Sequence, residues 1–325
     1  MKARIFGILA IAMTAFAVLA TPVLAADPDW PANLTVVTAS PGGTYHVYGA
    51  GLAKILTRAL GLPVAERITE GPSQNIEMIE AGDAQLGFVT IGAAMQAWNG
   101  VAEWTNGKQF RSIRALFPMY DTPFHFVALK DSGIRSIAGM AGKRIGVGPQ
   151  GGTAGTYIPM FLKTLKIDAA LSYGTWEELS VELSDGKLDV LAVAVGAPVP
   201  AIAGLEAKKK IIFVEPSREE ILALRLAMPE LTPSTIPAGV YPSLKKGYTS
   251  VGLYNFAVAS KDLPDSLVYA IVDAVFANHQ ELVQAHPAAA QTVPANFVHN
   301  TFLPYHPGAL RYYSNRVMTG AMKGD

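Results

Sequence analysis

A short apolar strand, a glycine-rich loop and an amphipathic helix form the first ordered pattern along the chain. Residues 34–37 are apolar or β-branched and predict a buried strand. Apolar residues then recur at the spacing of one helix face: Leu52, Ile55, Leu56 and Ala59. The intervening loop, 38–45, contains Gly42 and Gly43. A strand that passes through such a loop into a helix leaves free N–H groups at the helix N-terminus, and these groups can bind an anion. The alternative is a tight turn that binds no ligand.

The same order of elements is repeated later in the chain. A strand, a Gly-Gly loop, a helix, a strand, a helix, a glycine and a strand occur at about 34–90 and again at about 143–195, where Gly151-Gly152-Thr153 forms the loop. Alternating strands and helices are typical of the α/β class with parallel sheets, and two such units predict two similar domains. Ligands of open α/β sheets bind beyond the carboxyl ends of the strands, so the two loops should face one cleft.

Periodicity also predicts the individual elements. The predicted strands are 34–37, 64–69, 85–89, 124–129, 143–147, 171–173, 188–195, 211–214 and 251–259. Ser73 is a good N-cap residue for a helix carrying Ile76 and Ile79, and Pro264 begins another helix. Several prolines make 207–247 an ordered but loop-rich stretch.

The domains are predicted to be interleaved along the chain. No low-complexity linker separates them, so the simplest topology inserts one domain in the other, with strand crossings near 121 and 257. We expect lobe I to comprise 27–120 plus 258–325, and lobe II to comprise 121–257. Paired crossings of this kind form a hinge, which suits closure over a ligand.

The N-terminus has the pattern of a secretory signal peptide. Lys2 and Arg4 precede an apolar run over 5–20, and Val23-Leu24-Ala25 is a small-residue cleavage pattern. We expect residues 1–25 to be removed, with cleavage after Ala25 or Ala26. An uncleaved membrane anchor is the alternative, although the apolar run is short for a span. The predicted product is soluble and is exported to a bacterial periplasm.

Composition and motifs argue against several kinds of functional site. A formal net charge of +0 gives no support to nucleic-acid binding, and the lack of cysteine excludes disulfides and thiolate metal sites. The 6 histidines show no metal-ligand spacing, so neither a metal nor a cofactor is expected. Residues 146–151 match G-x-G-x-x-G, but Pro149 removes an amide that a dinucleotide loop needs. The sequence contains no G-x-S-x-G nucleophile-elbow motif, no H-E-x-x-H zinc-protease motif and no P-loop motif.

Polar and aromatic side chains gather instead in the loops that follow strands. They are Thr44, Tyr45, Ser73, Asn75, Thr90, Thr153, Thr156, Thr175 and Trp176. Hydroxyls, amides and aromatic walls without an acid–base pair suit binding rather than catalysis. Arg67, at the end of the second strand, is a candidate partner for a ligand carboxylate, with a surface role as the alternative. His125 lies near the expected hinge. It either faces the cleft or is a structural histidine whose ring nitrogens have hydrogen-bond partners within the protein.

Several ordered stretches resemble one family, the TAXI-type extracytoplasmic solute-binding proteins of TRAP transporters. They are Gly42-Gly43-Thr44-Tyr45, Ile79-Glu80-Ala81-Gly82-Asp83-Ala84-Gln85-Leu86, Asp131-Ser132-Gly133-Ile134, Gly142-Lys143-Arg144, Gly196-Ala197-Pro198-Val199-Pro200-Ala201-Ile202, Val251-Gly252-Leu253-Tyr254, Asp262-Leu263-Pro264, His306-Pro307-Gly308-Ala309 and Arg311-Tyr312-Tyr313. The resemblance implies a two-lobed type II periplasmic binding protein fold. It also implies a monomer that captures a small organic anion and delivers it to a sodium-coupled TRAP permease. The anion class is glutamate, glutamine or a C4–C5 dicarboxylate.

The resemblance also places the ligand contacts. By position they fall on Gly43, Thr44, Tyr45, Ser73, Asn75, Thr90, Gly152, Thr153, Ala154, Gly196 and Pro198. Where relatives often read Gly-Ser-Gly-Thr, this chain reads Gly151-Gly152-Thr153-Ala154, and Thr90-Ile91-Gly92 stands where relatives often have Gln-Ser-Asp. Both departures remove polar side chains from the expected cleft, so a less polar or differently shaped acid is an alternative ligand. An exported enzyme of similar fold and a periplasmic ligand sensor are the alternative functions.

Overall fold

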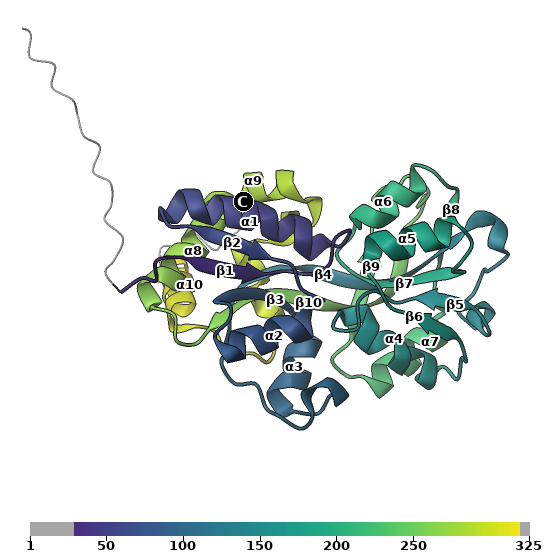
Figure 1. Cartoon of the computed structure of the whole chain (residues 1–325), viewed down its shortest axis with the longest axis horizontal. Helices are drawn as coiled ribbons and strands as arrows, with labels where there is room; N and C mark the ends of the chain where they lie inside the picture. Colours follow the sequence, from purple (N-terminus) through teal and green to yellow (C-terminus); the bar gives the residue numbers. More distant parts are fainter. Residues whose placement is uncertain (1–28, 319–325) are drawn as a thin grey trace, which may run out of the picture.

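The fold is a two-lobed α/β structure built on one continuous sheet (Figure 1). The computed structural model describes residues 29–318, so the predicted signal peptide over 1–25 lies outside the described residues. The strands are β1 Leu34–Val37, β2 Val64–Arg67, β3 Leu86–Thr90, β4 Ile113–Leu129, β5 Arg144–Gly146, β6 Ala170–Ser172, β7 Val190–Ala194, β8 Ile211–Val214, β9 Thr232–Ile236 and β10 Tyr248–Ser260. They follow the order β2-β1-β3-β10-β4-β7-β5-β6, with β8 paired to β4 and β9 paired to β10.

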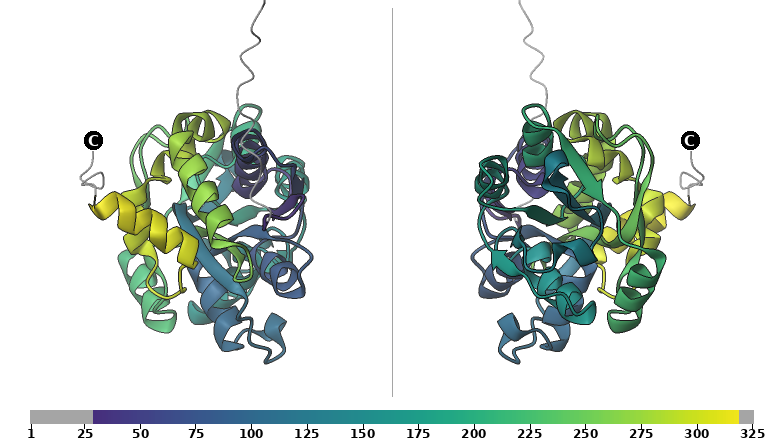
Figure 2. Two further views of the ribbon diagram at one scale, coloured as in Figure 1. Left: turned by 90° about the vertical axis from the view of Figure 1, so that its left-hand side faces the viewer. Right: turned by 90° about the vertical axis from the view of Figure 1, so that its right-hand side faces the viewer.

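Helices cover both faces of the sheet in each lobe (Figure 1). The helices are α1 Thr44–Leu60, α2 Pro72–Ala81, α3 Ile91–Asn99, α4 Thr153–Thr164, α5 Trp176–Ser184, α6 Pro200–Glu206, α7 Arg218–Ala227, α8 Asp265–Ala277, α9 His279–Ala285 and α10 Pro307–Met318. In the first lobe α1 packs on α8 and α9, and α2 packs on α3. In the second lobe α5 packs on α6, and α4 packs on α7. The end-on views of Figure 2 place the late, yellow-green helices at one end of the molecule and the teal second lobe at the other.

Two hydrophobic cores stabilise the structure, and one of them connects the lobes. One core lies in the first lobe, where the buried stripe of α1, including Tyr48, Leu52 and Ile55, meets Leu267 and Ile271 of α8. The second core begins under α2 and runs on into the second lobe. Because this second core is continuous, apolar burial as well as strand pairing connects the two lobes.

Strands β4 and β10 pass through the junction of the lobes as an antiparallel pair. Gly252 of β10 pairs with Pro123, and Ser260 pairs with Ile113. From Phe124 onward β4 pairs instead with β7 of the second lobe. The β4–β10 register shifts between Tyr254 and Phe256. This shift leaves Asn255 without a partner in β4 at the point where the two lobes meet, while on its other side Asn255 pairs with Thr90 of β3.

The local structure agrees with most of the sequence-based elements, and the differences have physical causes. The two Gly-Gly loops, the helices behind them and the helix end at Gly61, a left-handed residue at φ 67°, are confirmed. The predicted N-cap role of Ser73 is wrong, because α2 begins at Pro72 with Gly71 as its N-cap. Pro at the first helical position needs no hydrogen bond from its nitrogen, so the helix starts earlier. The stretch 207–247, predicted to be loop-rich, also contains α7 and β9.

Asp121 is an ionisable group at the β4–β10 junction. Its carboxylate accepts a hydrogen bond from the Ser234 hydroxyl of β9, and its N–H donates to Gln291 Oε1 over 3.1 Å. Burial raises the pKa of Asp121 from 3.8 to about 6, although the Ser234 hydrogen bond opposes this rise. The folded protein therefore holds this proton more tightly than the unfolded chain does.

We predict that Asp121→Asn stabilises the protein at neutral pH and flattens its pH dependence. Since the folded pKa is raised, the contribution of this group is greatest below about pH 4 and is lost as the pH rises through about 6. A shift of this size corresponds to roughly 3 kcal/mol as an upper bound. Urea unfolding at pH 4 and pH 7 measures the effect, with exposed Asp83→Asn as the matched control. Equal pH dependence in wild type and Asp121→Asn would contradict the assignment.

Candidate ligand-binding site

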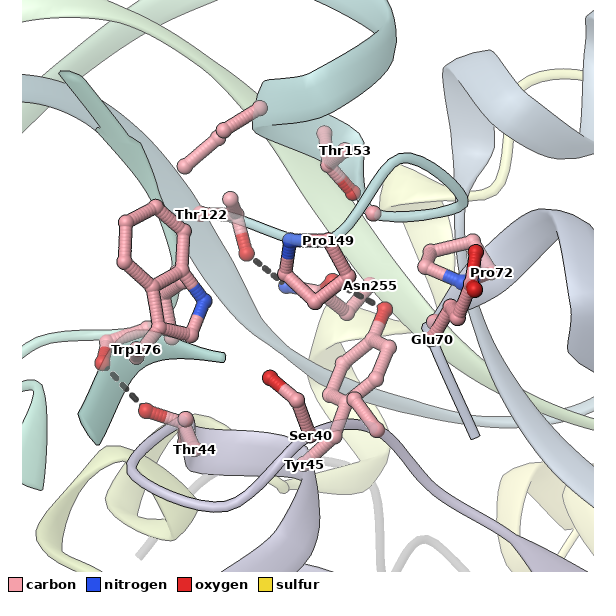
Figure 3. A pocket seen from close by; sticks show the side chains of 18 residues that line it. Ser40, Thr44, Tyr45, Glu70, Pro72, Thr122, Pro149, Thr153, Trp176 and Asn255 are labelled. Atoms are coloured by element: carbon pink, nitrogen blue, oxygen red, sulfur yellow. Dashed lines mark hydrogen bonds between the residues drawn. The ribbon is translucent and has the colours of Figure 1, made fainter. Parts of the chain in front are cut away.

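A pocket lies between the two lobes, at the carboxyl ends of their strands (Figure 3). It has an empty volume of about 420 Å³, counting the part open to solvent. Its lining comes from both lobes: Ala39, Ser40, Gly43, Thr44, Tyr45, Glu70, Gly71, Pro72, Thr122, Pro149, Gly152, Thr153, Ala154, Trp176, Ala194, Val195, Gly196 and Asn255. A concave site that is mostly apolar with a few polar groups is typical of a small-molecule site.

Two helix N-termini face this pocket from opposite lobes. Helix α1 begins after Gly43 and helix α4 begins after Gly152, and both glycines line the pocket. Both N-cap residues have extended backbone and make no side-chain capping hydrogen bond. The first-turn amides of an α-helix have no partner within the helix, and the helix dipole adds positive potential there. The two ends therefore offer a ligand oxygen backbone N–H groups without any cationic side chain.

Two further helices reach the pocket, but they differ in that N-terminal groups of both already have partners. At α2, whose Gly71 and Pro72 line the pocket, the Ser73 N–H donates to the Gly151 carbonyl over 3.3 Å. At α5 the N-terminus is capped by a side chain. Thr175 forms a capping box with Glu178, in which the Thr175 side chain accepts from the Glu178 N–H over 3.2 Å. What α5 contributes to the pocket is the buried indole of Trp176. Figure 3 shows this ring as one wall of the cavity.

Ser40 supplies a free hydroxyl. Its side chain is only 4% exposed, and its Oγ has no hydrogen-bond partner among the described residues. Figure 3 shows the hydroxyl directed into the cavity from the loop ahead of α1. An unpaired buried hydroxyl costs roughly 1–3 kcal/mol relative to a paired one. This group is therefore positioned to gain a partner when a ligand enters.

A buried hydrogen-bond network fixes the floor of the pocket. The Tyr45 hydroxyl donates to Asn255 Oδ1 over 2.6 Å, and Asn255 Nδ2 donates to the Tyr120 carbonyl over 2.6 Å. Asn255 Nδ2 also donates to Thr122 Oγ1 over 2.5 Å. Burial raises the pKa of Tyr45 well above its usual value, so its hydroxyl stays neutral. The network links α1, β4 and β10 and holds the Tyr45 ring against the cavity.

Charge at the pocket is confined to one residue. Among the 18 lining residues Glu70 is the single ionisable carboxylate, and none of them is Lys, Arg or His. Its Oε2 accepts from the Gly151 N–H of the opposite lobe over 3.1 Å. Figure 3 places Glu70 beside Pro72, on the side of the cavity away from Trp176.

Direct hydrogen bonds connect the lobes around the pocket. Thr44 Oγ1 donates to the Gly196 carbonyl over 2.5 Å, and Ser73 Oγ donates to the Gly151 carbonyl over 2.8 Å. The Ala201 N–H donates to the Gly42 carbonyl over 3.1 Å. The lobes also approach closely at Gly71, where an added Cβ would lie 3.0 Å from Gly152 Cα. The described arrangement is therefore one in which the lobes are closed against each other.

The pocket brings together eight of the sequence-predicted site residues. They are Gly43, Thr44, Tyr45, Gly152, Thr153, Ala154, Trp176 and Gly196. The predicted residues that do not line it are Ser73, Asn75, Thr90, Pro198, Arg67 and His125.

Four of these outlying residues support the loops around the pocket. Ser73 bonds across the lobes, and the Asn75 amide donates to the carbonyls of Thr38 and Phe88 over 2.8 and 2.9 Å. Thr90 Oγ1 lies 3.4 Å from Thr153 Oγ1. Pro198 follows a cis peptide bond, and its carbonyl oxygen lies 3.0 Å from His286 Nε2.

Arg67 and His125, for which the sequence allowed either a ligand contact or a structural or surface role, both lie away from the cavity. His125 is fully buried among Phe213, Tyr241 and Tyr248, with Nδ1 2.9 Å from the Pro123 carbonyl oxygen. Burial lowers the pKa of His125 to about 4, so the ring is neutral at physiological pH. Its environment is that of a structural histidine. Arg67 is exposed at the end of β2 and does not line the pocket.

Sequence reasoning missed several lining residues, of which Ser40, Glu70, Thr122 and Asn255 carry polar side chains. Ser40 and Glu70 each follow a strand of the first unit, so the rule that ligands gather beyond strand ends could have found them. Thr122 and Asn255 belong to the long β4–β10 pair. Their place depends on a long-range antiparallel pairing, for which the sequence carries no local signal.

We predict opposite stability effects for two nearby hydroxyl deletions in the absence of ligand. Ser40→Ala should leave the free energy of unfolding unchanged or raise it by about 1 kcal/mol, because its Oγ has no partner to lose. Thr69→Val is the matched control and should lower it by about 1–3 kcal/mol. Thr69 Oγ1 donates to Asn75 Oδ1 over 2.7 Å and accepts from the Gly71 N–H over 3.1 Å. Urea unfolding checks both, and equal destabilisation would show that the Ser40 hydroxyl is paired.

Over 29–318, no helix has the length and apolar character needed to cross a membrane. Within the same range, no group of three or more His, Asp or Glu side chains is arranged to hold a metal ion.

Comparison with known proteins gives the same fold. MatC from Rhodopseudomonas palustris, solved with bound malate, matches with a TM-score of 0.59 at 12% identity, over 88% of this chain and 98% of that chain. The periplasmic binding protein BugD matches with a TM-score of 0.55 at 14% identity, over 90% and 99% of the two chains. These likenesses confirm the predicted two-lobed type II periplasmic binding protein fold. The model of the NMT1-like family matches residues 36–316. Because this match covers most of the sequence, the chain belongs to the NMT1-like family.

Proposed function

We propose that this chain is a periplasmic solute-binding receptor that captures a small organic acid between its lobes. The observation that carries the proposal is the convergence of two uncapped helix N-termini and the unpartnered Ser40 hydroxyl on one interlobe pocket. Backbone amides and a hydroxyl are suitable partners for a carboxylate. The structural neighbour MatC, solved with malate, supports an acid as the ligand class.

The proposed ligand contacts are the predicted residues that line the pocket, together with Ser40. The amides of Thr44 and Tyr45 on α1, and of Thr153 and Ala154 on α4, would bind one carboxylate from both lobes. A ligand held in this way interacts with both lobes at once, so it binds the closed arrangement more tightly than an open one. Binding would then shift the population toward the closed state. We propose β4 and β10 as the hinge, with 27–120 plus 258–325 as lobe I and 121–257 as lobe II.

The residues that line the pocket are more suitable for binding a ligand than for catalysing a reaction. Among its residues, Glu70 is the single carboxylate, and neither histidine nor lysine is present to pair with it as an acid or base. We propose that the receptor is a TAXI-type protein that hands its ligand to the membrane subunits of a TRAP permease. The ordered motifs that resemble the TAXI family support this. Export by the predicted signal peptide would bring the mature chain to the periplasm.

We predict that small organic acids raise the melting temperature of the mature protein. The probes are malate, succinate, glutamate, glutamine and 2-oxoglutarate at millimolar concentration. An acid present at 100 times its Kd should add about 2.7 kcal/mol to the free energy of unfolding, because it binds the folded state alone. Thermal unfolding measures the shift, and the absence of a shift with all of these acids would contradict the proposed function.

For the best-binding acid, Ser40→Ala should raise Kd by about tenfold, since one hydrogen bond to an anion is lost. Ser314→Ala, at an exposed position of α10 away from the pocket, is the matched control and should leave Kd unchanged. Isothermal titration measures both variants. If the two variants bind with the same Kd, the Ser40 hydroxyl makes no contact with the ligand.

A further inference from the structure

Three side chains of the pocket carry a hydrogen-bond donor that has no acceptor within residues 29–318. The donors are the Ser40 hydroxyl, the Thr122 hydroxyl and the indole Nε1–H of Trp176. All three residues are buried, with exposed fractions of 4%, 2% and 5%. Because a buried donor without an acceptor is unfavourable, a bound molecule that places acceptors beside these groups gains binding free energy.

The amide of Asn255 determines which way the Thr122 hydroxyl points its proton (Figure 3). Asn255 Nδ2 lies 2.6 Å from the Tyr120 carbonyl oxygen, which can only accept, so this atom is the donor. Its second N–H donates to Thr122 Oγ1 over 2.5 Å, and Asn255 Oδ1 accepts from the Tyr45 hydroxyl over 2.6 Å. Thr122 Oγ1 is therefore the acceptor of its one hydrogen bond, and its own proton is available to a ligand in the pocket.

Close packing against two glycines holds the Trp176 ring in one orientation. A Cβ added to Gly148 would lie 2.5 Å from Cζ2 of the ring, and a Cβ added to Gly43 would lie 3.2 Å from Cδ1. The added Cβ of Gly43, the N-cap residue of α1, would lie 3.7 Å from Nε1. Figure 3 shows this nitrogen turned toward the cavity. The indole donor thus lies beside a helix N-terminus to which the proposed function gives the ligand carboxylate.

We infer that the pocket selects an acid with an oxygen acceptor on the carbon next to its carboxylate, a 2-oxo or 2-hydroxy acid, over the amino acid of the same skeleton. This inference rests on the proposed function. A carboxylate at the N-termini of α1 and α4 brings its neighbouring substituent close to the Trp176 donor. An oxo or hydroxyl oxygen accepts from such a donor. An ammonium group at the same place faces donors and the positive ends of two helix dipoles.

Glu70 is the one lining side chain that can form an ion pair with an ammonium group. Its side chain is exposed, and its Oε2 already accepts from the Gly151 N–H over 3.1 Å. Figure 3 places it on the side of the cavity away from Trp176. Because water competes for an exposed carboxylate, an ion pair there contributes little, and the buried donors decide the preference.

Malate, succinate and aspartate test the inference because they share one dicarboxylate skeleton and differ in a single substituent. That substituent is a hydroxyl, a hydrogen or an ammonium group. We expect the wild type to bind malate about tenfold more tightly than succinate, since one hydrogen bond is gained, and to bind aspartate most weakly. Two further sets repeat the comparison at other chain lengths: lactate, propionate and alanine, and 2-hydroxyglutarate, glutarate and glutamate. Isothermal titration measures each Kd.

Trp176→Phe removes the indole N–H and keeps an aromatic wall. In the set that binds best, it should reduce the preference for the hydroxy acid over the unsubstituted acid from about tenfold to below about threefold. Trp98→Phe makes the same change at a ring that does not line the pocket, and it should keep the preference. Thr122→Val should reduce the preference, whereas Thr122→Ser, which retains a hydroxyl, should keep it. The ratio of two Kd values is the readout, because a general loss of affinity leaves a ratio unchanged.

The outcomes separate the selection from the proposed function. Equal Kd values for the hydroxy and unsubstituted acids in every set overturn the selection and leave the organic-acid function standing. Tightest binding of the amino acid does the same. The selection also fails if Trp176→Phe changes the ratio no more than Trp98→Phe does. If no acid of any set binds and the wider panel gives no thermal shift, the organic-acid function fails, and the selection fails with it.

Discussion

The antiparallel pairing of β4 with β10 joins the two lobes and positions the pocket between them. Both strands pass through the junction, so both lobes belong to one sheet. At the register shift in this pair, the Asn255 side chain bonds the Tyr45 hydroxyl and the Tyr120 carbonyl. The same pair therefore connects the lobes and sets the floor of the pocket between them. A buried side chain with all of its polar atoms satisfied is well suited to hold such a junction in one arrangement.

The pocket combines main-chain donors at helix N-termini with one negatively charged side chain, Glu70. Main-chain amides at α1 and α4 are held in place by their helices, so binding a carboxylate requires little reorganisation of the protein. Lysine or arginine in the same place would have to lose side-chain freedom and hydration. The cross-lobe hydrogen bonds of Thr44 and Ser73 show that the lobes also contact each other directly. A ligand has to add to these contacts for closure to depend on it.

The repeated strand, glycine loop and helix made the fold class predictable from the sequence. The same repeat also predicted the positions of the loops at Gly43 and Gly152, because a glycine ahead of an apolar helical stripe is a local signal. The role of Ser73 could not be read in this way, since Pro72 starts its helix and the serine contacts the other lobe. The place of Thr122 and Asn255 in the pocket lining could not be predicted, for a different reason. Their position follows from a pairing between strands more than 100 residues apart, which local periodicity does not encode.

The most direct test of the central claim is to map where an acid binds by amide NMR. The mature protein, labelled with ¹⁵N, would be titrated with the best-binding acid of the thermal panel. We expect the largest shift changes at the first-turn amides of α1 and α4, at Thr44, Tyr45, Thr153 and Ala154, in both lobes together. Shift changes confined to one lobe, or to surfaces away from these two helix N-termini, would contradict it.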